Sequence, residues 1–244
     1  MSRSLPDNFF NNLNFQKFIT NVADDPELFP EIRDGSVTIY FRGDALIREM
    51  QVRNGQIVGQ VHFKYIPVVS PDNSNYLTLQ LGENGLSFLQ SVTPRLIGFG
   101  DSEALSEYKR VMESVGTGAE SLIVHKIVCN PDNNILDQET KFQSPGESKG
   151  DKIDICHFDT HLNCLAFVEV KGIHDPRLVP KANDWPEVVD QLIRYGRRIQ
   201  DQREVILDDY QRVAALKRRL GLSSRLTGVP SDGPQSLRGC PCRS

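Results

Sequence analysis

The chain has 244 residues and a formal net charge of −4 at pH 7, which is long enough for one large domain or two small ones. Apolar residues make up 39% and charged residues 25% of it, as in ordinary globular proteins, and the acidic balance excludes a surface that is basic all over. No apolar run is long enough to cross a bilayer, the first residues lack the apolar core of a signal peptide, and the five scattered cysteines do not describe a disulfide framework. These features predict a cytoplasmic protein that does not bind membranes.

Residues 1–100 are predicted to form a strand-rich N-terminal part. The first 34 residues carry scattered phenylalanines, which indicate a short helix packed on the body: Phe9, Phe10, Phe15 and Phe18. Alternating apolar residues then predict strands over residues 37–41, 45–52, 57–65 and 76–81. Asn54-Gly55 is typical of a tight hairpin turn. The hypothesis for this part is a role in recognition or oligomerisation. Whether the protein forms a homodimer is left open by the sequence.

The middle of the chain is predicted to hold one or two helices before a polar segment. A helix is predicted over residues 103–115. Residues 118–128 fit either a helix or a buried strand, and their β-branched content favours the strand. Residues 130–134 form a predicted turn, and residues 143–149 form a predicted polar loop.

The C-terminal part is predicted to be helical and then disordered. Asp184 as a capping residue, Pro186 and Glu187 indicate the start of a helix. A second helix is predicted over residues 208–220, closed by Gly221. Apolar residues become rare after Leu222, so residues 223–244 are predicted to be a disordered tail.

Two short apolar runs in the middle of the chain carry the charged residues of greatest interest, Asp154 and Glu169-Val170-Lys171. Residues 159–163 between the runs predict a hairpin loop, which places Asp154 opposite Glu169. Strand alternation points Glu169 and Lys171 to the same side. Buried charges are costly unless they are paired or hold a metal, and two carboxylates suit Mg²⁺, with Mn²⁺ as a substitute. The plainer interpretation is a cross-strand salt bridge on the exposed side of a hairpin, which contributes little.

This arrangement resembles the PD-(D/E)XK nuclease superfamily, although Ile153 stands where that family often has a proline. The resemblance implies an α/β (α+β) fold with a central mixed β-sheet flanked by helices, and a restriction-endonuclease-like core over residues 101–222. It also implies that Asp154, Glu169 and the Val170 carbonyl hold magnesium while Lys171 takes part in catalysis. A further core strand that commonly follows in the family has no counterpart after residue 222.

The family also places a glutamate on a helix before the aspartate strand. Glu120 is the best match for this residue as a further metal ligand. Glu113, on the preceding predicted helix, is the rival candidate.

Gln191 and Tyr195 lie four residues apart on the predicted helix and therefore share one face. They resemble the Q-x-x-x-Y motif of the RecB-like branch of the superfamily, which implies that they position a nucleic-acid strand. Nine basic residues against six acidic ones lie between residues 186 and 225. The prediction is that Arg194, Arg197 and Arg198 contact phosphates. On charge alone, a solvated helix surface is the plainer explanation.

These features together predict a magnesium-dependent nuclease that hydrolyses phosphodiester bonds, above all in DNA. The competing prediction is a catalytically inactive module of the same fold that binds nucleic acid or protein. A third alternative is a truncated chain that folds poorly, suggested by the loss of pattern after Leu222. The sequence leaves open whether the substrate is single- or double-stranded and whether it is cut as by an endonuclease or from an end.

Overall fold

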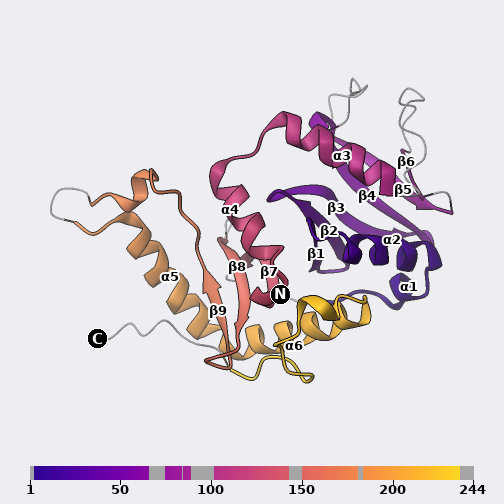
Figure 1. The fold of residues 1–244 in the computed structure, drawn as a ribbon. Coiled ribbons are helices and arrows are strands. Elements are labelled where there is room, and N and C mark those ends of the chain that lie inside the picture. Colours follow the sequence, from indigo (N-terminus) through magenta and orange to yellow (C-terminus); the bar gives the residue numbers. More distant parts are fainter. Residues whose placement is uncertain are drawn as a thin grey trace. The chain divides into compact units, whose positions relative to one another are not determined.

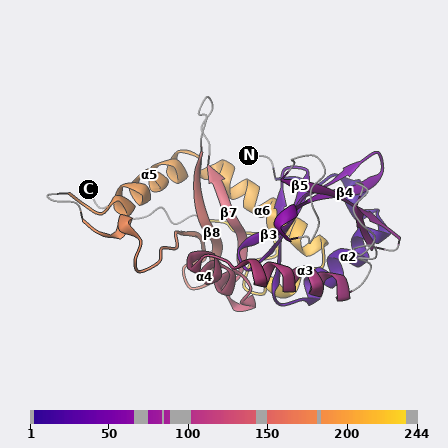
Figure 2. The same ribbon diagram turned by 90° about the horizontal axis from the view of Figure 1, so that it is seen from above.

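The computed structural model describes residues 3–65, 75–83, 85–88, 102–142, 150–180 and 184–236. The chain divides into two compact units. The N-terminal unit comprises Ser2–Asn130 and Leu216–Ser223, and the C-terminal unit comprises Pro131–Ala215 and Ser224–Ser244. Figures 1 and 2 show the elements of both units in two views.

The N-terminal unit contains a six-stranded sheet in which every strand pairs antiparallel with the next one along the chain. The strands are β1 (Leu28–Arg33), β2 (Ser36–Phe41), β3 (Asp44–Arg53), β4 (Gln56–His62), β5 (Tyr76–Gly82) and β6 (Gly85–Phe88). Asn54 and Gly55 join β3 to β4 and both have positive φ angles, 51° and 79°, as a type I′ hairpin turn requires. The predicted strands and this turn are confirmed, except that the strand predicted over residues 57–65 ends at His62 and a 3₁₀ turn follows it at Phe63–Tyr65. Strands β1 and β6 were not predicted.

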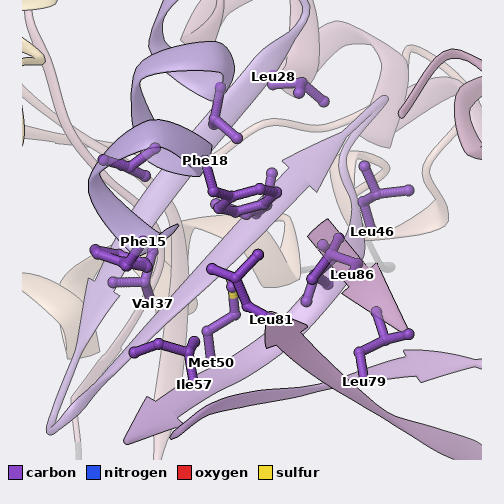
Figure 3. Close-up of a cluster of buried hydrophobic side chains, with 14 of the residues drawn as sticks. Phe15, Phe18, Leu28, Val37, Leu46, Met50, Ile57, Leu79, Leu81 and Leu86 are labelled. Atoms are coloured by element: carbon purple, nitrogen blue, oxygen red, sulfur yellow. The ribbon is translucent and has the colours of Figure 1, made fainter. Parts of the chain in front are cut away.

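Helices complete the N-terminal unit: α1 (Asp7–Phe10), α2 (Leu13–Asp24), α3 (Ser102–Val115) and α4 (Ala119–Val128), with a short 3₁₀ turn at Phe63–Tyr65. The Asn12 side chain caps α2 by accepting a hydrogen bond from the Phe15 N–H at 3.0 Å. Figure 3 shows Phe15 and Phe18 of α2 packed among buried residues of the strands, including Val37, Met50 and Leu81. The predicted N-terminal helix with buried phenylalanines is therefore confirmed, and residues 119–128 form a helix rather than a strand.

The C-terminal unit contains a three-stranded antiparallel sheet in the order β7-β8-β9. Its strands are β7 (Ile135–Phe142), β8 (Asp151–Asp159) and β9 (Cys164–Val168), and its helices are α5 (Glu187–Asp201) and α6 (Arg203–Arg219), with 3₁₀ turns at Pro131–Asn133, Pro176–Leu178 and Ser223–Arg225. One apolar cluster joins the sheet to both helices through side chains such as Leu165, Tyr195 and Tyr210. The β8–β9 hairpin was predicted, but β7 was not, and β9 ends at Val168 rather than at residue 171.

The helix starts differ from those predicted. Pro186 is the residue before α5, and no side chain of the described residues caps this helix. The Asp184 carboxylate instead accepts from the neighbouring Trp185 N–H at 2.9 Å. Helix α6 begins at Arg203 rather than at residue 208 and ends at Arg219. Gly221 closes it as predicted, because its φ of 81° allows the Leu222 N–H to donate to the Lys217 carbonyl at 2.9 Å.

The contacts divide the chain at a different place from the predicted boundary at residue 100. Helices α3 and α4 belong to the N-terminal unit, and α6 contributes residues up to Ala215 to the C-terminal unit and later ones to the N-terminal unit. Part of the predicted tail is packed: Leu226 and Val229 are buried in the C-terminal core, and the Ser236 carbonyl accepts from the Leu165 N–H at 2.9 Å. Residues 237–244 lie outside the described residues.

The chain thus combines helices with two sheets, which confirms the mixed α and β class. Both sheets are antiparallel throughout the described residues, whereas a mixed sheet was expected. The restriction-endonuclease-like arrangement of the core stays a prediction. Among the described helices, none is both long and apolar enough to cross a membrane.

Candidate active site

The β8–β9 pairing brings Asp154 and the Glu169-Val170-Lys171 segment together. Ile155 pairs with Val168, and the same antiparallel register, continued by one residue, places Asp154 opposite Glu169 on one face of the sheet. The Val170 N–H donates to Asp154 Oδ2 at 2.7 Å. Asp154 therefore fixes the backbone just after the end of β9, where the regular strand ladder has stopped.

The Glu169 side chain is the centre of this cluster and is only 5% exposed. Its Oε1 atom accepts from Lys171 Nζ at 2.5 Å and from Gln191 Nε2 at 2.9 Å. Its Oε2 atom is buried and has no hydrogen-bond partner among the described residues. Burial raises the pKa of Glu169, and Asp154 adds to the rise, while Lys171 and Gln191 oppose it. An acceptor oxygen without a donor is unusual in a folded interior.

Lys171 lies against two of the four predicted metal ligands, Glu169 and the Val170 carbonyl. The Lys171 side chain is 9% exposed, and its ammonium donates to the Val170 carbonyl at 3.2 Å as well as to Glu169. A cationic group therefore already neutralises part of the negative charge at this point. The arrangement provides one ammonium and two carboxylates, so it retains a net negative charge that suits a further cation.

Gln191 and Tyr195 share a face of α5, as predicted, and this face is turned toward the site. The Gln191 amide donates both to Glu169 and to the Tyr195 hydroxyl. The Tyr195 hydroxyl donates in turn to the Lys152 carbonyl of β8 at 2.7 Å. Tyr195 is 4% exposed, and this burial raises the pKa of its hydroxyl.

Two of the three arginines predicted to contact phosphates are paired with Asp151 at the start of β8. Arg194 Nε lies 3.1 Å from Asp151 Oδ1, and Arg198 Nε lies 2.8 Å from Asp151 Oδ2. Arg198 also donates to the Phe142 carbonyl at 3.3 Å, whereas half of the Arg194 side chain faces solvent and Arg197 is exposed. Asp151 was not singled out from the sequence. Its only signal there is that a carboxylate begins a strand, while a later helix carries two arginines four residues apart.

Glu120 lies in the first turn of α4, and its rival Glu113 lies on α3, where it pairs with Arg42 at 3.4 Å. Both glutamates belong to the N-terminal unit, whereas Asp154, Glu169 and Lys171 belong to the C-terminal unit. In the part of the chain that the structure describes, no three His, Cys, Asp or Glu residues form a group that could hold a metal. The role of Glu120 as a ligand stays a prediction.

Comparison of this chain with protein-family models, with curated proteins and with solved structures gave no match. The interpretation of the site therefore depends on its own geometry and on the motif resemblance.

Proposed function

We propose that this protein is a magnesium-dependent nuclease that hydrolyses phosphodiester bonds in DNA, and that Asp154, Glu169 and the Val170 carbonyl hold the ion. The Glu169 carboxylate carries the proposal. It is almost fully buried, two donors bind one of its oxygens, and the other oxygen has no partner among the described residues. Leaving a buried charged acceptor without a partner costs about 1–3 kcal/mol or more.

The donor set fits a small hard cation. Magnesium in proteins typically takes one or two carboxylates, keeps several waters and binds phosphate oxygens of the substrate. Asp154 and Glu169 supply two carboxylates on one sheet face. The contact of the Lys171 ammonium with Glu169 and with the Val170 carbonyl supports the assignment, because it shows that these oxygens accept positive charge.

The chain's own groups can then perform distinct tasks. When bound, magnesium neutralises charge on the scissile phosphate and lowers the pKa of a water molecule. Lys171 donates to oxygens at this point and is placed to stabilise the charge that grows on the phosphoryl group. Arg197, exposed on α5, can bind a neighbouring phosphate without reading sequence.

A catalytically inactive binding module is the second candidate. One observation favours it: within the described ranges, no group of three residues capable of holding a metal was found. Such a module would bind nucleic acid or protein through the same surface and would cut nothing.

The test is cleavage of linear, circular and single-stranded DNA by the full chain with Mg²⁺, Mn²⁺ or EDTA. The variants are Asp154→Asn and Lys171→Met, with Asp201→Asn as a control that removes an exposed carboxylate at the end of α5. We expect the wild type and the control to cut only with metal, Asp154→Asn to lose both metal binding and cleavage, and Lys171→Met to keep metal binding while losing cleavage. Metal binding without cleavage of any substrate by a cooperatively folding wild type would favour the binding module instead.

A further inference from the structure

Only one assignment of donors and acceptors is consistent with the hydrogen bonds around Gln191. The Tyr195 hydroxyl carries a single hydrogen, which it donates to the Lys152 carbonyl at 2.7 Å, so it must accept from the Gln191 amide nitrogen. The second hydrogen of the same amide nitrogen then points to Glu169 Oε1 at 2.9 Å. The reversed amide would place its oxygen against the carboxylate, which is repulsive. The Gln191 amide therefore donates in both directions, and a continuous chain of hydrogen bonds links Glu169 through Gln191 and Tyr195 to the Lys152 carbonyl of β8.

The burial of these groups separates two possible roles. Tyr195 is 4% exposed, and the Glu169 side chain is 5% exposed. The Tyr195 hydroxyl has used its hydrogen on the protein backbone, and both hydrogens of the Gln191 amide nitrogen are used on Tyr195 and Glu169. These donors are turned inward and already occupied, so they are poorly suited to contact a nucleic-acid strand.

We infer that Gln191 and Tyr195 are positioning residues for the Glu169 carboxylate rather than contacts for the nucleic-acid strand, an inference that depends on the proposed function. Lys171 and Gln191 hold Glu169 Oε1 from two sides, which fixes the rotation of the carboxylate group. This orientation leaves Oε2, the oxygen without a partner among the described residues, as the atom available to a cation.

The two positioning residues do different things. Gln191 touches the carboxylate itself, whereas Tyr195 acts only through Gln191 by holding its amide in the correct orientation. Loss of a group that orients a metal ligand typically weakens metal affinity by about 10- to 100-fold. The Gln191 variants should therefore lose more affinity than a Tyr195 variant.

The experiment measures the dissociation constant for Mn²⁺ by isothermal titration calorimetry, without nucleic acid, and separately the affinity for DNA in EDTA. The variants are Gln191→Leu, Gln191→Glu and Tyr195→Phe, each checked for a wild-type thermal melt. Arg197→Gln serves as the matched control, since Arg197 is an exposed residue of the same helix. Tyr195→Phe changes one atom and keeps the ring in the core, so it remains informative if the other variants fold poorly.

We expect Gln191→Leu to weaken Mn²⁺ binding by about 10- to 100-fold and Tyr195→Phe by less, with DNA affinity in EDTA unchanged in both. Gln191→Glu should also weaken Mn²⁺ binding, because its ionised carboxylate cannot donate to Glu169 Oε1 and no longer fixes the orientation of that carboxylate. Arg197→Gln should instead keep the wild-type Mn²⁺ affinity and weaken the binding of DNA in EDTA. Unchanged Mn²⁺ affinity together with weaker DNA binding in the Gln191 variants would overturn this inference and leave the proposed function standing. A wild type that binds no Mn²⁺ would overturn both.

Discussion

Asp154 has two tasks in this structure, and they can be separated by two substitutions. Its Oδ2 atom accepts from the Val170 N–H at 2.7 Å, beyond the last paired residue of β9. Val170 is buried, with 8% exposed, so water does not readily replace a lost acceptor. Asp154→Ala removes both the acceptor and the proposed metal ligand, whereas Asp154→Asn keeps an oxygen that can accept from Val170 and removes only the charge.

The magnitude follows from the kind of hydrogen bond. A hydrogen bond to a charged group contributes about 1.5–3 kcal/mol, and every 1.4 kcal/mol corresponds to about a tenfold change in an equilibrium. We therefore expect the Val170 amide to exchange its hydrogen about 10- to 100-fold faster in Asp154→Ala than in the wild type. In Asp154→Asn the increase should remain below about tenfold, because the neutral hydrogen bond is retained.

The assay is hydrogen exchange of the metal-free full chain, resolved at the Val170 amide and compared with the Ile155 amide inside the β8–β9 ladder. Cleavage measured in parallel should be lost in both variants, since both lack the carboxylate. Equal exchange rates at Val170 in Asp154→Ala and the wild type would show that this hydrogen bond does not hold the segment. The account of Asp154 as a structural acceptor would then be wrong.

Three further predictions concern ionisation and buried polar groups. Burial raises the pKa of Glu169 above its ordinary value of 4.5. The stabilisation of the metal-free fold by protonated Glu169 is therefore fully present below pH 4.5 and is lost as the pH rises through the folded-state pKa, which thermal melts in EDTA should show. Mn²⁺ affinity should weaken as the pH falls, because the proton competes with the metal for Glu169. Tyr210→Phe removes a 2.9 Å hydrogen bond to the buried Asp137 carboxylate and should lower the free energy of unfolding of the C-terminal unit by about 2 kcal/mol in a urea titration; a change below about 0.5 kcal/mol would contradict the role of that hydrogen bond. Lys217→Met removes the ammonium 3.0 Å from Glu31, which is 0% exposed and keeps its ion pair with Arg33 at 3.0 Å, and should cost about 2 kcal/mol; recovery of stability by the second substitution Glu31→Leu would support this reason, and no recovery would argue against it.

Features with a local physical cause were predictable from the sequence. The Asn54-Gly55 turn needs two positive φ angles, which those residue types adopt readily. The β8–β9 hairpin follows from two apolar runs joined by a short polar loop, and its register then sets Asp154 opposite Glu169. The shared face of Gln191 and Tyr195 follows from the helical period alone.

Strands β1 and β7 were missed because their polar residues are buried against partners far along the chain. Glu31 of β1 pairs with Lys217, which lies 186 residues later. Asp137 and Thr140 of β7 both contact the hydroxyl of Tyr210. A buried carboxylate in such a strand looks like an exposed one in the sequence, since nothing nearby marks its partner.

The sequence by itself determined the order of the hairpin and helix, the two carboxylates with their lysine, and the face of α5 that carries Gln191. Only the tertiary structure decided what those side chains contact: Gln191 binds Glu169, two arginines pair with Asp151, and residues after Leu222 include Leu226 and Val229 of the C-terminal core. The physical reason is that backbone period and turn chemistry act over a few residues, whereas the partner of a buried polar group is supplied by whichever distant segment packs against it.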